Sequence, residues 1–434
     1  MTTAVAAKRL SQTRSIASYF TGSLAASALS LLATLLVTRW TSPRELGIWN
    51  FALVISTYLS ALQAGVFNGL NRQLPYYMGR GDTPAFERAA NAAHGWCLAL
   101  SGMSVAVTLA LAALFAFDGQ MERVYTILAI GTVVGCSWFL QFLTVGYSGT
   151  AQFGSFARKN AVNAALGLPM ALFAYALGYA GLLIRATAMA ALNIVLLGHG
   201  RPLASRPRWD PAALWALGRV GFPIWVVGQL GALFMTLDRV VLAGSSEALG
   251  FYAIAAQFAA LAMMVPTSFN AVHYPHMARD YGATHRARPI WSQAARAALT
   301  SAGWGLALWV PCWFLIPIFV EHVLPAYVPG IPAARWAALT GVAMAPSIFG
   351  NIFNLLGRQD IYLLSSAAGL GAFASAWYVL TRMLHLPPIE SAAQCMLAGT
   401  FVASMCSAIL SLWLCRRHDA RQVNEPTAAE GFRA

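Results

Sequence analysis

The chain has 434 residues, of which 58% are hydrophobic and 10% are charged, and its formal net charge at pH 7 is +13. Soluble domains carry roughly a quarter charged residues, so a chain of this composition cannot cover a surface that faces water. Its apolar residues gather in blocks of about 17 to 27 residues, long enough to cross a hydrocarbon core of roughly 30 Å as helices. The composition excludes a soluble globular protein and predicts an all-α integral membrane protein.

Twelve apolar segments follow one another along the chain. We expect membrane spans at Ile16–Val37, Ile48–Leu70, Ala89–Phe117, Val124–Tyr147, Ala161–Leu177, Leu182–Leu197, Val220–Ala243, Leu249–Val272, Ala294–Val320, Ala334–Leu356, Ile361–Leu384 and Ala392–Cys415. Lys8, Arg9 and Arg14 precede the first segment. Its apolar length exceeds that of a signal-peptide core, so we expect it to stay in the protein as a signal anchor.

Positive charge is distributed unevenly between the loops. If the N-terminus is cytoplasmic, 21 of the 28 Lys and Arg residues fall in inner segments, 6 fall in outer segments, and Arg185 lies within a helix. Because cytoplasmic loops are enriched in Lys and Arg, this bias predicts a bacterial inner-membrane protein with both termini in the cytoplasm. The basic excess then faces anionic membrane lipids, and the charge needs no nucleic acid to explain it.

One long polar break, from Gly198 to Arg219, divides the spans into two sets of six. All other loops are short, which leaves no room for a soluble catalytic domain. We expect residues 1–200 to form an N-terminal six-helix lobe, 201–219 a cytoplasmic linker, 220–415 a C-terminal six-helix lobe and 416–434 a cytoplasmic tail.

The two halves repeat a pattern of residues. Each has an Arg at the end of a span, then Leu-Gly, an aromatic residue, an Asn near the inner end of the next span and a Pro soon after it. The matching pairs are Arg39 and Arg239, Leu46-Gly47 and Leu249-Gly250, Trp49 and Tyr252, Asn68 and Asn270, and Pro75 and Pro275. Because each half has an even number of spans, the repeats insert in the same orientation. This predicts parallel pseudo-two-fold repeats around a central cavity.

Arg185 is an arginine within an apolar helix. Such a residue is costly in hydrocarbon and usually faces a cavity or a partner, so it is a candidate for binding an anion. It also lies about one turn from the outer end of its predicted span, from where its side chain could reach the headgroups instead. Arg39, Arg72 and Arg239 are further candidates for a cationic cavity, with headgroup anchoring as the alternative for Arg39 and Arg72.

Acidic residues are nearly absent from the spans. Of the 15 Asp and Glu residues, only Asp238 lies inside a predicted span. Asp238 and Arg239 should point about 100° apart on a helix and contact different partners, and we expect Asp238 to form a structural or coupling ion pair. An exporter of cationic drugs driven by protons or sodium would want a carboxylate deep in the membrane. The sequence therefore favours an anionic substrate.

Amide side chains form a second polar set. Its members are Gln63, Asn68, Asn71, Gln229, Asn270, Asn351 and Asn354. Within one segment they recur at spacings that share a helix face. They could line a cavity for a glycan, or they could join neighbouring helices by hydrogen bonds.

Metal chemistry has little support in this sequence. The six cysteines fall inside apolar blocks with neither a CxxC pair nor a zinc spacing. His273 and His276 form an HxxH pattern without a third ligand in view. We expect no metal, no cofactor and no catalytic residue.

Several sequence stretches together resemble the Wzx-type polysaccharide and O-antigen flippases of the multidrug/oligosaccharidyl-lipid/polysaccharide (MOP) exporter superfamily. In the first half these are TRWTSPRELGIWNF and RQLPYYMGRGD. In the second half they are GFPIWVVGQL, LDRVVLAGSSEALGFYAIAAQF, YPHMARDYG and FVEHVLPAYVPG. No single stretch is specific, but the series occurs in the expected order over most of the chain.

The resemblance implies a MATE-like fold of two six-helix bundles that moves an undecaprenyl-diphosphate-linked oligosaccharide from the cytoplasmic to the periplasmic leaflet. It also implies partners in the polymerase or export machinery of surface polysaccharides. Two other classes stay open: a multidrug-extrusion or major-facilitator exporter of small molecules, and a membrane polymerase or ligase of lipid-linked sugars. The short outer loops disfavour the enzyme, and MGRGDTPAFERAA does not match the loop typical of major-facilitator carriers.

Overall fold

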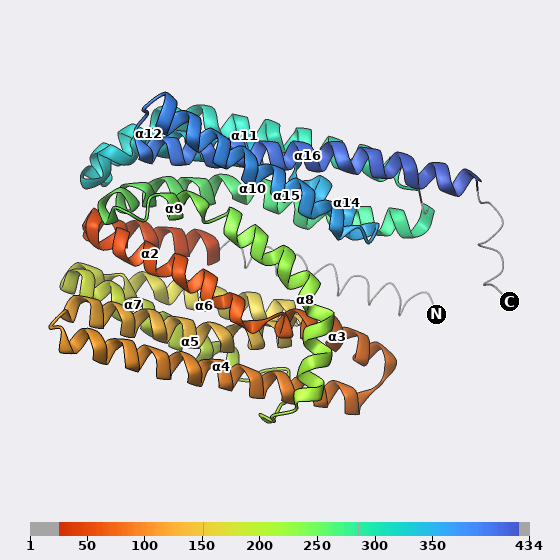
Figure 1. Cartoon of the computed structure of the whole chain (residues 1–434), viewed down its shortest axis with the longest axis horizontal. Coiled ribbons are helices and arrows are strands. Elements are labelled where there is room, and N and C mark those ends of the chain that lie inside the picture. The colour runs from red at the N-terminus through yellow and green to blue at the C-terminus, as the bar shows by residue number, and fades with distance from the viewer. Residues whose placement is uncertain (1–25, 151, 285, 425–434) are drawn as a thin grey trace. The chain divides into compact units, whose positions relative to one another are not determined.

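The computed structural model describes residues 26–150, 152–284 and 286–424. Within these ranges every regular element is a helix. The chain forms two compact units, Met1–Gln229 and Leu230–Ala434 (Figure 1). The start of the first predicted span, Ile16 to Ala25, and the end of the predicted tail from residue 425 lie outside the described residues.

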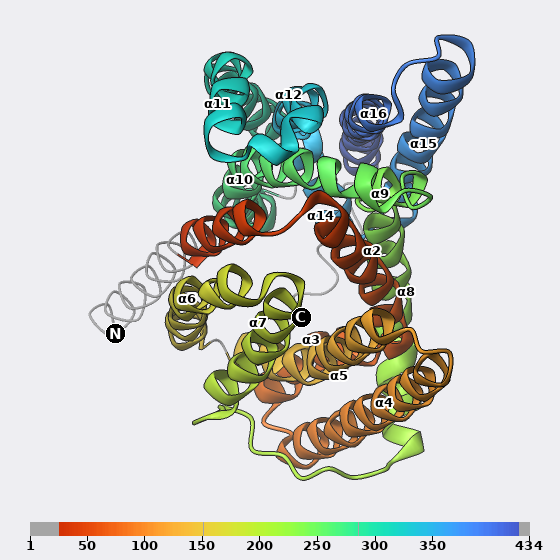
Figure 2. The ribbon, with the colours of Figure 1, turned by 90° about the vertical axis from the view of Figure 1, so that its left-hand side faces the viewer.

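The first unit contains the helices of the first six predicted spans and most of α8. Its elements are a helix at Ala26–Trp40, α2 (Pro43–Leu59), a 3-10 turn (Ser60–Gln63), α3 (Val66–Arg80), α4 (Thr83–Phe117), α5 (Met121–Gly149), α6 (Phe153–Met170), α7 (Leu172–Gly198) and α8 (Pro211–Phe234). Helices α4 and α5 pack along each other, as both views of the ribbon show (Figure 2). With α3 they enclose a core around Leu70, Trp138, Phe142 and Tyr147.

The second unit also consists mainly of long helices, but its tenth predicted span is divided into several short helical segments. Its elements are α9 (Leu237–Val241), α10 (Ser246–Thr284), α11 (Arg288–Val323), a 3-10 turn (Pro325–Gly330), α12 (Ile331–Ala338), α13 (Thr340–Ala343), a 3-10 turn (Ala345–Phe349), α14 (Gly350–Leu355), α15 (Gln359–Tyr378), a π turn (Val379–Met383) and α16 (Pro388–Asn424). Helices α15 and α16 lie side by side.

Within the described residues, each predicted span coincides with a helix or a series of helical segments. Ten stretches among the described residues are long and apolar enough to cross a membrane. Of the other two predicted spans, the first is described only as Ala26–Trp40, and the fifth, Ala161–Leu177, coincides with the second part of α6 and the first part of α7 before Gly178. The prediction of an all-α membrane fold with about twelve spans is confirmed.

The second predicted span, Ile48–Leu70, is broken in its middle. Ala64 and Gly65 both have positive φ, +49° and +82°, and separate α2 and its 3-10 turn from α3. Just beyond the break α3 crosses α8 at very short range. A Cβ on Gly69 would lie 2.0 Å from the carbonyl oxygen of Leu217, and one on Gly221 would lie 1.9 Å from that of Gly65. Only residues without a side chain allow the two backbones to approach this closely.

The turn between the fifth and sixth predicted spans is made by Gly178. Its φ of +57° and ψ of −130° interrupt α7, a conformation that glycine adopts without a steric penalty. The chain folds back so tightly that a Cβ on Gly181 would lie 1.8 Å from the carbonyl oxygen of Phe173.

The segment between α7 and α8 is attached to the first unit by specific contacts. Leu203 is buried, the backbone N–H groups of Arg206 and Arg208 donate to Asn91, and Asp210 binds Arg88. Helix α8 begins at Pro211, so the second part of the predicted linker 201–219 is helical.

Candidate functional site

Arg185 lies on α7, seven residues after the reversal at Gly178 and therefore about 10 Å along the helix axis. It is half-buried. A Cβ on Gly167 of α6 would lie 3.8 Å from Nη2 of Arg185, so the missing side chain at Gly167 makes room for the guanidinium. The Nε atom of Arg185 is buried and has no hydrogen-bond partner among the described residues. Arg185 therefore lies about two helical turns from the reversal at Gly178, which is deeper than the one turn that the sequence predicts.

Two amides that the sequence analysis did not select lie on the same pair of helices. Asn193 is eight residues after Arg185 and lies on the same face of α7. Asn163 is one turn before Gly167 and lies on the same face of α6. Helices α6 and α7 pack together. The side-chain oxygens of Asn163 and Asn193 are buried without a partner within the described part of the chain.

We call Arg185, Asn163 and Asn193 the α6–α7 polar seam. Leaving a buried donor or acceptor unpaired costs about 1–3 kcal/mol, and more for a charged group. A seam that holds one guanidinium nitrogen and two amide oxygens without partners among the described residues is therefore suited to water or to a polar ligand. Asn163 lies four residues from Gly167 and Asn193 lies eight residues from Arg185, and these spacings in the sequence could have identified the two amides.

Arg39 and Arg72 lie on the surface of the first unit. Both are exposed, Arg39 at the end of the helix Ala26–Trp40 and Arg72 on α3. Among the described ion pairs, none includes either residue.

The amides of the second span make local and interhelical bonds. Gln63 is buried, accepts from the backbone N–H of Phe67 at 3.0 Å and donates to Asn68 at 3.2 Å. It thereby satisfies the first turn of α3 after the break at Ala64. Asn71 accepts a hydrogen bond of 2.8 Å from Ser148 and joins α3 to α5. Gln229 lies half-buried on α8.

In the second unit Asp238 is buried in α9. One carboxylate oxygen accepts from the Tyr252 hydroxyl at 2.7 Å, and the other accepts from the backbone N–H of Arg239 at 2.8 Å. Nε of Arg239 lies 3.8 Å from this second oxygen. The expectation that Asp238 and Arg239 contact different partners is therefore wrong in part. Because α9 starts at Leu237, Asp238 lies in its first turn, where its carboxylate folds back onto the next residue.

Asn270 and Asn351 meet at the broken tenth span. Asn270 on α10 donates to Ser347 at 3.2 Å and accepts from Asn351 on α14 at 3.4 Å. These bonds hold α10 against the irregular segment around Pro346. Asn354, one turn after Asn351, is exposed.

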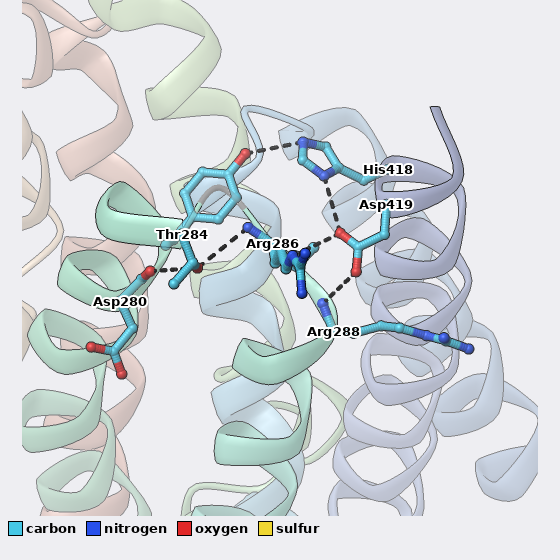
Figure 3. A network of polar contacts seen from close by, with 8 residues as sticks. Asp280, Thr284, Arg286, Arg288, His418 and Asp419 are labelled. Atoms are coloured by element: carbon cyan, nitrogen blue, oxygen red, sulfur yellow. Dashed lines mark hydrogen bonds and ion pairs between the residues drawn. The ribbon is translucent and has the colours of Figure 1, made fainter. Parts of the chain in front are cut away.

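A polar network joins α10, α11 and α16 at the end of the second unit that carries Arg286 and Arg288 (Figure 3). The carboxylate of Asp419 accepts from the backbone N–H groups of Ala287 and Arg288 at 2.7 and 3.0 Å. It thus caps the start of α11 from another helix. His418 lies 3.1 Å from the hydroxyl of Tyr281, and burial together with the charge of Asp419 raises the pKa of that phenol.

Several cavities lie within single units. One, of about 650 Å³, is in the first unit and is lined by parts of α3, α4 and α8. A second, of about 360 Å³, lies between α4, α5 and α7, and a third, of about 240 Å³, lies between α10, α11 and the α12–α13 segment. Within the described residues, no three His, Cys, Asp or Glu side chains are grouped so that they could hold a metal ion.

No protein-family model matches the sequence, and no curated protein does. Solved structures do match. An inward-facing multidrug resistance MATE family transporter of the MOP superfamily aligns with a TM-score of 0.71 and 15% identity, covering 92% of this chain and 99% of its own. A MOP superfamily transporter from Pyrococcus furiosus aligns with a TM-score of 0.67 and 15% identity, covering 94% and 97%. The Vibrio cholerae MATE transporter VcmN in its bent form aligns with a TM-score of 0.60 and 16% identity, covering 95% of this chain and 99% of its own. The chain thus has the fold of the MATE transporters of the MOP superfamily.

Proposed function

We propose that the chain is a flippase that moves an undecaprenyl-diphosphate-linked oligosaccharide repeat unit across a bacterial inner membrane by alternating access. The observation that carries this proposal is the α6–α7 polar seam, in which the Nε atom of the half-buried Arg185 is buried and has no hydrogen-bond partner among the described residues. The substrate's diphosphate is an anion that must lose its water to cross hydrocarbon. A guanidinium fork binds phosphate oxygens at two points and can replace that water.

The distribution of acids supports an anionic substrate. Asp238 is the acid inside a predicted span. The Tyr252 hydroxyl and the backbone N–H of Arg239 already donate to its carboxylate, and Nε of Arg239 lies 3.8 Å from it. A cationic drug would find no free carboxylate at this position. An oligosaccharide, in contrast, needs donors and acceptors without charge, which the amides of the seam can supply.

The fold is compatible with more than one cargo. The matched proteins include multidrug resistance transporters. For the Pyrococcus furiosus transporter, the reverse polarity of the binding pocket is said to suggest a different function. The second candidate is therefore a multidrug exporter. The major-facilitator alternative is dropped, because the fold is that of the MATE transporters. A membrane polymerase or ligase remains the third class.

Orientation and partners belong to the same proposal. The bias of Lys and Arg toward alternate loops puts both termini and the segment 199–210 in the cytoplasm. The carried repeat unit would then serve surface polysaccharide synthesis, such as O-antigen or exopolysaccharide, and pass to a polymerase or export machinery on the outer side.

Deletion of the gene tests the proposal. We expect intact undecaprenyl-diphosphate-linked repeat units to accumulate on the cytoplasmic face and surface polysaccharide to be lost, with both effects reversed by the wild-type gene. Lipid extraction with mass spectrometry measures the intermediate. Normal surface polysaccharide together with raised drug sensitivity would favour the multidrug exporter and contradict the flippase.

A further inference from the structure

A cavity of the first unit lies where α4 and α8 begin. It has a volume of about 650 Å³. Gln73 and Tyr77 of α3, Arg88 of α4, and Trp215 and Arg219 of α8 contribute its polar and aromatic lining. None of these residues belongs to the α6–α7 polar seam, and the transport proposal uses none of them.

The cavity has an excess of positive charge. Arg88 donates from Nε and Nη2 to the two carboxylate oxygens of Asp210, at 2.6 and 3.2 Å. Asp210 also accepts from the backbone N–H of Ala213 at 3.0 Å, so its charge is directed at Arg88 and at the first turn of α8. Arg219 is exposed, and no described ion pair includes it. The Arg219 charge is therefore not compensated.

The position of the cavity along the helices is that of the membrane interface. Arg88 directly precedes the predicted span that begins at Ala89, and Trp215 and Arg219 precede the one that begins at Val220. The headgroup layer extends roughly 5–7 Å beyond the hydrocarbon on each side. Trp215 is 76% exposed, and Trp and Tyr are enriched at this level because their rings are apolar at one end and polar at the other.

We propose that this cavity binds the phosphate of an anionic glycerophospholipid headgroup. Arg219 donates to the phosphate oxygens, and Arg88 contributes the N–H donors that Asp210 does not use. Gln73 and Tyr77 are placed to bond the polar part of the headgroup, and Trp215 covers the glycerol backbone. A zwitterionic lipid carries the same phosphate with a compensating cation, so the uncompensated Arg219 selects the anionic lipid.

The test uses the purified full-length chain in detergent and native mass spectrometry with increasing phosphatidylglycerol or phosphatidylcholine. We expect phosphatidylglycerol to bind more tightly. Arg219→Gln should weaken that binding about tenfold, the effect of losing one hydrogen bond to a charged group. Arg158→Gln, which removes an exposed Arg of α6 outside the cavity, should not. Trp215→Ala should weaken binding of both lipids.

Three outcomes would overturn the proposal. The first is equal binding of the two lipids. The second is an equal loss in Arg219→Gln and Arg158→Gln, which would indicate attraction by net charge alone. The third is displacement of phosphatidylglycerol by an equal concentration of inorganic phosphate, which would make the ligand a soluble phosphate. The control is thermal unfolding without added lipid. A melting temperature of Arg219→Gln equal to that of the wild type shows that the variant is folded.

Discussion

At the scale of single residues, the feature with the greatest functional weight is Arg185, a cation that forms no ion pair with the described residues. Arg185 could be selected from sequence because arginine is rare inside an apolar helix. The sequence could not show that Gly167 makes space for its guanidinium, because this contact joins two helices. Asn163 and Asn193 escaped selection since isolated amides in apolar helices are more common than arginines.

Arg185→Ala should abolish complementation of a deletion strain without lowering the abundance of the protein in the membrane. A charge-assisted hydrogen bond contributes about 1.5–3 kcal/mol, or roughly 10- to 150-fold in affinity. Arg185→Lys keeps the charge but loses the two-point fork, so it should retain partial activity. Surface polysaccharide measured by gel electrophoresis and protein measured by immunoblot give the two readouts.

The control for this prediction is Arg158→Ala, which removes an exposed Arg from α6. It should complement like wild type. Full complementation by Arg185→Ala would return Arg185 to the alternative role of anchoring at the headgroups.

Asp210 makes the stability of the first unit depend on pH. The hydrogen bond and charge of Arg88, with the backbone N–H of Ala213, lower the pKa of this carboxyl to about 2. Since the folded pKa is below the unfolded one, of about 3.9, the stabilisation is complete above about pH 5 and is lost as the pH falls toward 2. Asp210→Asn should lower the melting temperature at pH 7, and its difference from wild type should shrink as the pH falls.

Melting curves of the purified proteins in detergent from pH 7 to the lowest pH that keeps them soluble measure this effect. The difference in melting temperature between Arg88→Gln and wild type should also shrink as the pH falls, because this variant removes the other partner of the Arg88–Asp210 ion pair. A difference between wild type and Asp210→Asn that stays constant over this range would contradict the assignment of the pKa.

At the scale of elements, the spans were predictable and their interruptions were not. Apolar length alone locates a helix within a membrane, which is why the described part of every predicted span coincides with helical structure. The break at Ala64 has no signal at that residue itself, since alanine favours helix. The break is stabilised by the side chain of Gln63 and by the crossing of α3 and α8. Both depend on tertiary contacts that a single sequence does not reveal.

The α3–α8 crossing predicts a sharp difference between two glycines of the same helix. Gly69→Ala would place a methyl group 2.0 Å from the carbonyl oxygen of Leu217. The backbones must then separate, and we expect a loss of at least about 1–3 kcal/mol of folding free energy. Gly79→Ala meets nothing within 4 Å and serves as the matched control.

Thermal unfolding in detergent, with membrane abundance as a second readout, compares the two variants. Gly79→Ala should unfold at or slightly above the wild-type temperature, because alanine restricts the unfolded chain. Equal melting temperatures for Gly69→Ala and Gly79→Ala would contradict the close crossing of α3 and α8.

At the scale of the whole molecule, the pattern of charge carries the information on function. The sequence predicted an all-α fold with about twelve spans, which the structure confirms, and the comparisons place this fold among the MATE transporters of the MOP superfamily. A fold shared by transporters of different cargoes does not determine the substrate. The substrate has to be inferred from the seam around Arg185 and from the scarcity of acids in the spans.

Other contacts at this scale were beyond sequence analysis. Asp419 caps the start of α11 from α16, more than a hundred residues later in the chain, and Asp210 pairs with Arg88 across a similar separation. An acid near a basic loop has many possible partners in a single sequence. The geometry of the folded units is needed to select one of them.

Transport by the purified chain in proteoliposomes is the direct test of whether it is a flippase. A fluorescent polyprenyl-diphosphate-linked oligosaccharide is added to vesicles, and its exposure to a membrane-impermeant quencher is followed over time. We expect wild-type protein to make this lipid cross far faster than in protein-free vesicles, and a cationic drug not to be carried. If the lipid crosses no faster than in protein-free vesicles and the drug is carried instead, the flippase proposal is contradicted.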